Sequence, residues 1–157
     1  MDAYQAIITK RDLRDYDTRP IPDDVLQRIL QAGRMAGSSS NSQPVRYVVL
    51  TNRDTIKALK AFGRGTRQLE ESPLYILAFL QDQARHFDVG RAFQNMMVAA
   101  WADGVLSCPV GLQDLESVSK TLGVPEDWRL SIGIAFGYPA PATGAANPNP
   151  RPRLALD

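Results

Sequence analysis

Two stretches of the chain carry residue types that could bind an anionic ligand containing a flat ring. The basic cluster, residues 10–14, reads Lys-Arg-Asp-Leu-Arg and puts three cations within five positions. Lysine and arginine side chains neutralise phosphate groups. The serine loop, residues 37–44, reads Gly-Ser-Ser-Ser-Asn-Ser-Gln-Pro. Its hydroxyl, amide and backbone N–H groups can hydrogen-bond the polar edge of a heterocycle.

The elements that flank these two stretches can be predicted from apolar spacing. A short helix over residues 2–9 leads into the basic cluster. Residues 23–35 predict a core-facing helix, because one face carries Val25, Leu26, Ile29, Leu30 and Ala32. We expect Gly37 to end this helix by taking a positive φ. After the serine loop, residues 47–50 read Tyr-Val-Val-Leu and predict a strand covered on both faces.

The rest of the chain continues to interleave helices with strands. Helices are predicted at 54–62, 87–102 and 114–122, and strands at 74–80, 105–110 and 130–137. Residues 87–102 are apolar on more than one face, which predicts burial in the core and at a subunit interface. Interleaved elements without a linker predict one α+β or α/β sandwich around a single sheet.

Composition excludes several classes of protein. A chain of 157 residues with 44% hydrophobic content fits one globular domain. Its net charge of +1 provides no overall field for nucleic acid or an anionic membrane surface. One cysteine, Cys108, cannot form an intrachain disulfide and fits a reducing compartment. With no signal-peptide pattern and no long apolar run, we expect a cytoplasmic protein.

Taken together, the motifs resemble the FMN-dependent nitroreductase family. "TKRDLRDY" and "PIPDDVLQRILQAGRMAGSSSNSQPVRYVVL" are similar to the family's R-R-S-x-R-x-F and P-x-P-x-x-x-L … S-x-x-N-x-Q-P-W patterns. The likeness continues in "FDVGRAFQNMMVAAWADGVLSCPVG", "LGVPEDW" and "IAFGYPA" and is weakest over residues 60–73. It implies an α+β fold, a nitroreductase-like three-layer α/β/α sandwich around a mostly antiparallel sheet, and a homodimer. Residues 1–157 would form one domain with an extended tail from about residue 139.

The resemblance also implies a set of cofactor-binding residues. They are Lys10, Arg11, Asp12, Arg14, Ser38, Ser39, Asn41, Gln43, Leu106, Ser107, Arg151 and Arg153. The basic cluster would hold the FMN phosphate, and Arg14 the pyrimidine edge of the ring. The backbone at Leu106 and Ser107 would lie over the flavin near N5. The two arginines of the tail would return to the phosphate.

Several residues depart from the family pattern. Asp12 replaces the usual serine, as it does in relatives that use O2 to cleave flavin into dimethylbenzimidazole. We interpret Asp12 as a salt-bridged organiser of the cluster or, alternatively, as a catalytic group; we name no other catalytic residue. Gly37 and Val45 replace a proline and a tryptophan, and Leu106 and Pro109 add bulk where substrates usually stack.

The expected activity is transfer of a hydride from NAD(P)H through FMN to an electron-poor small-molecule acceptor. The alternatives are an O2-using, flavin-cleaving enzyme and a protein that binds flavin or deazaflavin without NAD(P)H turnover. No metal site is expected, because His86 has no ligand pattern around it. Cys108 is interpreted as a small buried residue rather than a redox thiol.

Overall fold

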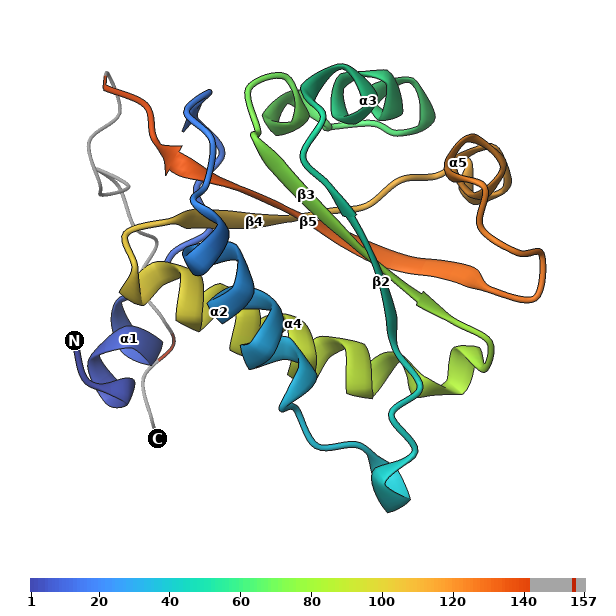
Figure 1. The fold of residues 1–157 in the computed structure, drawn as a ribbon, viewed down its shortest axis with the longest axis horizontal. Helices are drawn as coiled ribbons and strands as arrows, with labels where there is room; N and C mark the ends of the chain where they lie inside the picture. Colours follow the sequence, from blue (N-terminus) through green and yellow to red (C-terminus); the bar gives the residue numbers. More distant parts are fainter. Residues whose placement is uncertain (142–153, 155–157) are drawn as a thin grey trace.

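A five-stranded sheet forms the centre of the computed structural model, which describes residues 1–141 and Leu154 (Figure 1). The strands are β1 (Tyr16–Asp17), β2 (Arg46–Leu50), β3 (Leu74–Leu80), β4 (Leu106–Val110) and β5 (Arg129–Pro139). Four of the strands lie side by side in the order β1-β5-β3-β2, and β4 pairs with β5 as well. All of these pairings are antiparallel. The sheet therefore needs no crossover helix between neighbouring strands.

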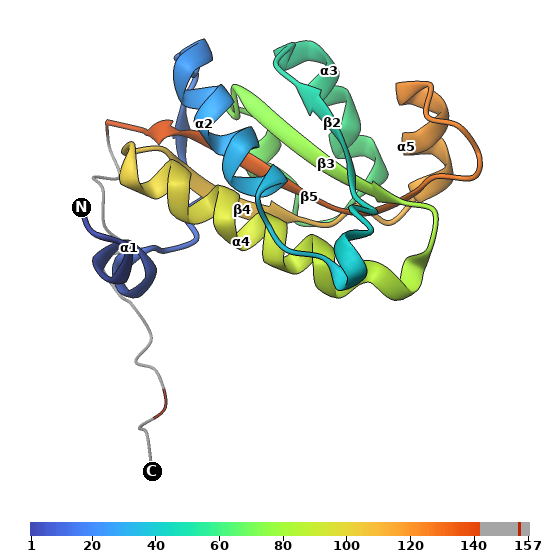
Figure 2. The same ribbon diagram turned by 60° about the horizontal axis from the view of Figure 1, so that its bottom comes forward.

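Helices cover both faces of the sheet. One face carries α1 (Ala3–Thr9), α2 (Asp23–Arg34) and the long α4 (His86–Ala102), and α2 crosses α4 (Figure 2). The other face carries α3 (Arg53–Ala58), which continues as a 3₁₀ turn over Leu59–Phe62, and α5 (Leu115–Leu122). Asp114 caps α5 by accepting a hydrogen bond from the Ser117 N–H at 3.1 Å. Gly123 ends α5 with φ +65°, as the sequence predicts.

Strand β3 divides the interior into two cores. Its even-numbered side chains pack with α2 and α4, and its odd-numbered side chains pack with α3 and α5. Every residue of β3 is buried, as expected for a strand with helices over both faces. The predicted α+β, three-layer arrangement around a mostly antiparallel sheet is confirmed.

Two local expectations were wrong. Strand β2 is an edge strand that pairs with β3 alone, and its residues are half-buried or exposed rather than covered on both faces. Gly37 does not take a positive φ, because α2 ends earlier, at Arg34, and Met35 is its C-cap residue. The small size of Gly37 matters for a different reason. A Cβ added there would lie 2.7 Å from a guanidinium nitrogen of Arg91 on α4.

Some expectations concern parts of the chain beyond this description. Arg151, Arg153 and most of the predicted tail lie outside the described residues. Within the described part, no helix is both long enough and apolar enough to cross a bilayer. The same residues contain no group of three or more histidine, cysteine, aspartate or glutamate side chains suited to a metal ion.

Candidate functional site

The basic cluster begins where α1 ends, and Arg11 completes that end. A helix leaves its last carbonyls without intrahelical partners. One guanidinium nitrogen of Arg11 donates to the Ile8 carbonyl at 2.9 Å and to the Lys10 carbonyl at 2.8 Å. Trp101 on α4 donates to the Thr9 hydroxyl at 3.0 Å and ties this end of α1 to α4. Arg11 therefore has a structural role already, although the sequence predicted it as a phosphate ligand.

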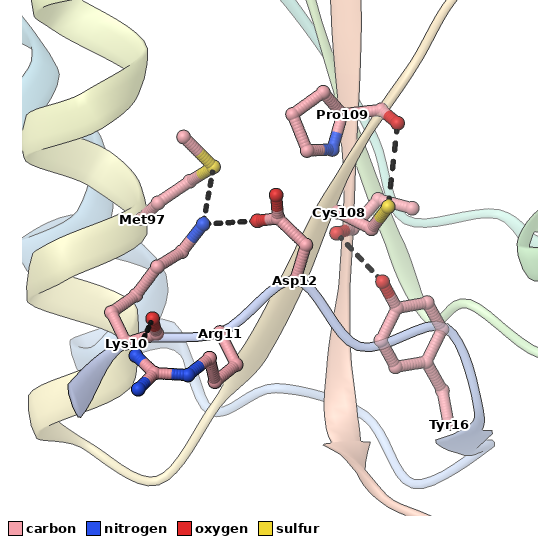
Figure 3. A network of polar contacts seen from close by, with 8 residues as sticks. Lys10, Arg11, Asp12, Tyr16, Met97, Cys108 and Pro109 are labelled. Atoms are coloured by element: carbon pink, nitrogen blue, oxygen red, sulfur yellow. Dashed lines mark hydrogen bonds and ion pairs between the residues drawn. The ribbon is translucent and has the colours of Figure 1, made fainter. Parts of the chain in front are cut away.

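Lys10 points into the protein rather than into solvent. Figure 3 shows its ammonium directed at the Asp12 carboxylate and at the Met97 sulfur. The Lys10 side chain is 9% exposed, whereas the Asp12 side chain is 48% exposed. A cation this buried needs a charged or hydrogen-bonding partner, and Asp12 supplies it. The pairing fits the prediction that Asp12 organises the cluster.

Asp12 and Leu13 run alongside the beginning of β4. Asp12 forms an isolated parallel bridge with Ser107, and the Leu13 N–H donates to the Ser107 carbonyl at 3.2 Å. The Ser107 hydroxyl is buried and has no hydrogen-bond partner among the described residues. The side chain of Leu106 packs into the core on the α3 and α5 side. Only the backbone of Leu106 could therefore contact a ligand beside Ser107.

Arg14 differs from the other two cations of the cluster. Its side chain is exposed, and no carboxylate in the described part of the chain forms an ion pair with it. Burial raises the pKa of the nearby Cys108 thiol, and the positive charge of Arg14 opposes this rise. Burial also raises the pKa of Tyr16 well above its usual value. Both groups are therefore neutral near pH 7, and the charge of Arg14 stays available to a ligand.

The serine loop is shaped by strained backbone and by its own hydrogen bonds. Three non-glycine residues have positive φ: Ser40 at 51°, Asn41 at 54° and Gln43 at 48°. The Gln43 N–H donates to the Ser38 hydroxyl at 2.9 Å, and the Gln43 amide donates to the Asn41 side-chain oxygen at 3.3 Å. Ser38 is half-buried, and Ser39, Asn41 and Gln43 are exposed. Positive φ at non-glycine residues is uncommon and is typical of functional loops.

The two regions lie beside opposite halves of α4. Lys10 contacts Met97 near the end of the helix, and Gly37 lies against Arg91 near its beginning. Six positions separate these contacts, or about 9 Å along the helix axis. Figures 1 and 2 both show α1 at one end of α4 and the loop between α2 and β2 at the other. One chain therefore carries both predicted halves of the site without joining them.

The residues of the first half fit one edge of a flavin. They provide a cation at Arg14 that forms no ion pair with a carboxylate of the described residues, and a buried hydroxyl at Ser107 without a hydrogen-bond partner among them. A ligand with hydrogen-bonding groups would satisfy Ser107, since a buried polar group without a partner costs free energy.

Sequence reasoning missed two residues near these regions. Met97 contacts the Lys10 ammonium, with a sulfur–nitrogen distance of 3.3 Å. Asp88 is a buried carboxylate on α4, 6% exposed. A signal for Asp88 was present, because it precedes Ala92 and Met96 at four-residue spacing on the buried face of the helix.

Comparisons with known proteins identify relatives over most of the chain. The sequence profile described as "Nitroreductase family" matches residues 7–84 and 80–138. A protein named NADH dehydrogenase from Thermus thermophilus is 29% identical over 89% of this chain and 88% of its own. The crystal structure of a putative NADH dehydrogenase/NAD(P)H nitroreductase from Parabacteroides distasonis has a TM-score of 0.86. It is 22% identical and covers 98% of this chain and 93% of its own.

A further solved structure of similar fold has FMN in its name and contains bound NAD+. It is the NADPH:FMN oxidoreductase from Vibrio harveyi, complexed with NAD+. Its TM-score is 0.84 and its identity 26%, over 98% of this chain and 73% of its own length.

Proposed function

The chain is an oxidoreductase of the nitroreductase family, and we propose that it binds FMN and transfers electrons from NAD(P)H to an electron-poor small molecule. The names of its relatives support NAD(P)H-linked flavin chemistry. FMN, when bound, supplies that chemistry by accepting a hydride from the nicotinamide and passing two electrons on. The protein then has to bind, orient and charge-stabilise the reactants.

The separation of the basic cluster from the serine loop is the observation that carries this proposal. Each region offers polar or charged groups to a ligand, and one chain keeps the two regions at opposite halves of α4. A second copy, related by a twofold axis, would bring its serine loop to the first copy's basic cluster. Exposed apolar side chains support such a dimer. They are Tyr4, Ile7 and Ile8 on α1, together with Met35 and Phe87.

Arg14 and Ser107 have the clearest roles in this proposal. Arg14 brings a positive charge without a paired carboxylate to the edge of the ring, where negative charge develops when the flavin is reduced. The buried Ser107 hydroxyl gains a partner when a polar atom of the ligand lies beside it. From the second copy, the Asn41 amide would read the polar edge of the ring, and Ser38 would hold the loop in shape.

Asp12 supports a second candidate function, cleavage of reduced flavin by O2. The Asp12 backbone forms a bridge with Ser107, and the Asp12 carboxylate stays half-exposed while paired with Lys10. A carboxylate placed this way could contact a ligand as well as organise the cluster. Formation of dimethylbenzimidazole from reduced FMN in air would favour this candidate. NAD(P)H oxidation without that product favours the first.

An absorption spectrum tests the proposal. The purified protein is recorded before and after anaerobic addition of NADH or NADPH. We expect flavin bands that bleach on addition and recover when an electron-poor quinone or nitroaromatic is supplied. Bands that do not bleach would indicate a flavin-binding protein without NAD(P)H turnover. A colourless protein that takes up neither FMN nor a deazaflavin contradicts the cofactor assignment.

A further inference from the structure

An open pocket of about 600 Å³ lies where the serine loop begins, between the end of α2 and the first half of α4. Residues 35–37 form one of its walls. The α4 side chains that line the other wall are Phe87, Arg91, Gln94 and Asn95. An aromatic ring, a cation and two amides therefore meet in one pocket that is large enough for a small molecule.

Arg91 is the charged member of this lining. Within residues 1–141 and Leu154, no carboxylate forms an ion pair with Arg91 and no acceptor takes a hydrogen bond from it. Its guanidinium carbon lies 5.8 Å from the centroid of the Phe87 ring. One of its nitrogens lies 2.7 Å from the point that a Cβ on Gly37 would occupy. The glycine thus leaves room for the guanidinium beside the loop, and the N–H donors of Arg91 stay available to a ligand.

The groups in the pocket match a ligand that carries a phosphate next to a flat base. A guanidinium binds phosphate through parallel N–H donors, and it also stacks on aromatic rings. Phe87 is 76% exposed, so its ring offers a flat surface beside the cation. NADPH carries a phosphate on the ribose that bears its adenine, and NADH lacks this group. The pocket therefore contains what is needed to distinguish the two coenzymes.

We propose that this pocket binds the adenosine 2′-phosphate end of NADPH, and that Arg91 makes the protein prefer NADPH to NADH. The inference rests on the proposed function, because the nicotinamide end of the same molecule has to reach the flavin. The pocket adjoins the serine loop at Gly37. A dinucleotide is long enough to place its adenosine there while its nicotinamide lies further along the loop.

A second copy of the chain is the competing occupant of this face, because Met35 and Phe87 expose apolar side chains. Any contact between copies has to leave Arg91 a polar partner, since a cation buried without one costs free energy. A phosphate in the pocket would provide that partner. The pocket therefore fits an anionic ligand better than it fits an apolar protein surface.

Two nucleotides test the requirement for the 2′-phosphate. Adenosine 2′,5′-bisphosphate carries this group, and adenosine 5′-monophosphate lacks it. In calorimetric titrations of the purified, flavin-loaded protein, we expect a Kd of about 1 mM or below for the bisphosphate and at least about tenfold weaker binding of the monophosphate. Equal binding of the two nucleotides contradicts the proposal. Release of FMN by the bisphosphate would mean that the pocket holds the flavin phosphate, and would also overturn it.

Two variants locate the site. Arg91→Ala should weaken binding of the bisphosphate about tenfold or more and leave binding of the monophosphate unchanged. Arg85→Ala is the matched control, because it removes the same charge near the beginning of α4 from an arginine that lies 3.6 Å from the Asp82 carboxylate. It should bind both nucleotides as wild type does. Equal binding of the bisphosphate by wild type and Arg91→Ala contradicts the proposal. Dissociation of Arg91→Ala into monomers would show that Arg91 serves the contact between copies, and would overturn it.

Steady-state kinetics separate this inference from the proposed function. For wild type, kcat/KM should be about tenfold or more higher with NADPH than with NADH. Arg91→Ala should lose this preference while its kcat/KM with NADH stays the same. Oxidation of both coenzymes without a preference refutes the inference and leaves the proposed function intact. Oxidation of neither coenzyme refutes the proposed function, whereas Arg91-dependent binding of the bisphosphate would still support the pocket.

Discussion

The basic cluster and the serine loop obtain their shapes in different ways. In the cluster, distant elements hold the side chains, since α4 contacts Lys10 through Met97 and β4 bridges to Asp12. In the loop, the holding contacts are local, and three residues keep a positive φ. Substitutions in the cluster should therefore act mainly through charge and ligand affinity. Substitutions in the loop should act mainly through the conformational energy of the backbone.

The largest effect should come from Arg14, the cation without a paired carboxylate. Arg14→Ala should weaken FMN binding by about 2 kcal/mol, or roughly thirtyfold, because a hydrogen-bonded charge is lost. Arg11→Ala is the matched control, since Arg11 serves the end of α1. It should lower the free energy of unfolding by about 1 kcal/mol and change FMN affinity little. Fluorescence titration and urea unfolding measure the two quantities. An equal loss of FMN affinity in Arg14→Ala and Arg11→Ala would contradict the assignment of ligand binding to Arg14 and of a structural role to Arg11.

Asp12→Ser should separate affinity from stability within the cluster. The change leaves the Lys10 ammonium without its carboxylate, so the flavin-free protein should lose about 1 kcal/mol of stability. The released charge becomes available to the ligand, so FMN should bind several-fold more tightly. Weaker FMN binding together with lost turnover would instead make Asp12 a group that contacts the cofactor or substrate.

The sequence was informative where one periodic pattern decides a structure. The burial of β3 on both faces and the apolar face of α2 follow directly from the order of their residues. The motif letters also located the basic cluster and the serine loop. They could not show that Arg11 turns back onto α1 or that Lys10 turns inward, because both depend on contacts with distant residues such as Met97. Edge position is likewise a property of the whole sheet, which explains the error at β2.

In the serine loop, Ser40→Gly should raise the stability of the fold by relieving backbone strain, whereas the substitutions in the basic cluster act through charge. Ser40 has φ 51°, where a side chain costs about 1–2 kcal/mol, and glycine relieves that cost while adding freedom to the unfolded chain. We expect a net gain of about 0.5 kcal/mol in the free energy of unfolding. Ser42→Gly is the control, because Ser42 has an ordinary φ of −67°. It should lose about 0.5–1 kcal/mol. A loss in both variants would show that Ser40 is not strained.

The smallest effect should be a change in the free energy of unfolding at alkaline pH, caused by Cys108 and Tyr16 beside the basic cluster. Burial raises the pKa of Cys108 from its usual 9.0 and the pKa of Tyr16 from its usual 10.0, so folding favours their protonated forms. This contribution is complete only well below pH 9 and is lost as pH rises and the thiol and phenol of the unfolded chain ionise. Urea midpoints should therefore fall gently between pH 8.5 and about 10. Cys108→Ala should flatten the first part of that fall. An unchanged slope of urea midpoint against pH in this variant would contradict a contribution from the Cys108 thiol.

The central claim is that the basic cluster of one copy and the serine loop of another form one flavin site. Heterodimers of differently tagged subunits test it, with Arg14→Ala in one subunit and Asn41→Asp plus Gln43→Glu in the other. If the site is shared, each heterodimer has one intact site and one doubly altered site, so flavin content should be about half that of wild type. Each altered homodimer should bind little. A heterodimer that binds no more flavin than the altered homodimers would place both regions of a site in the same chain and contradict the claim.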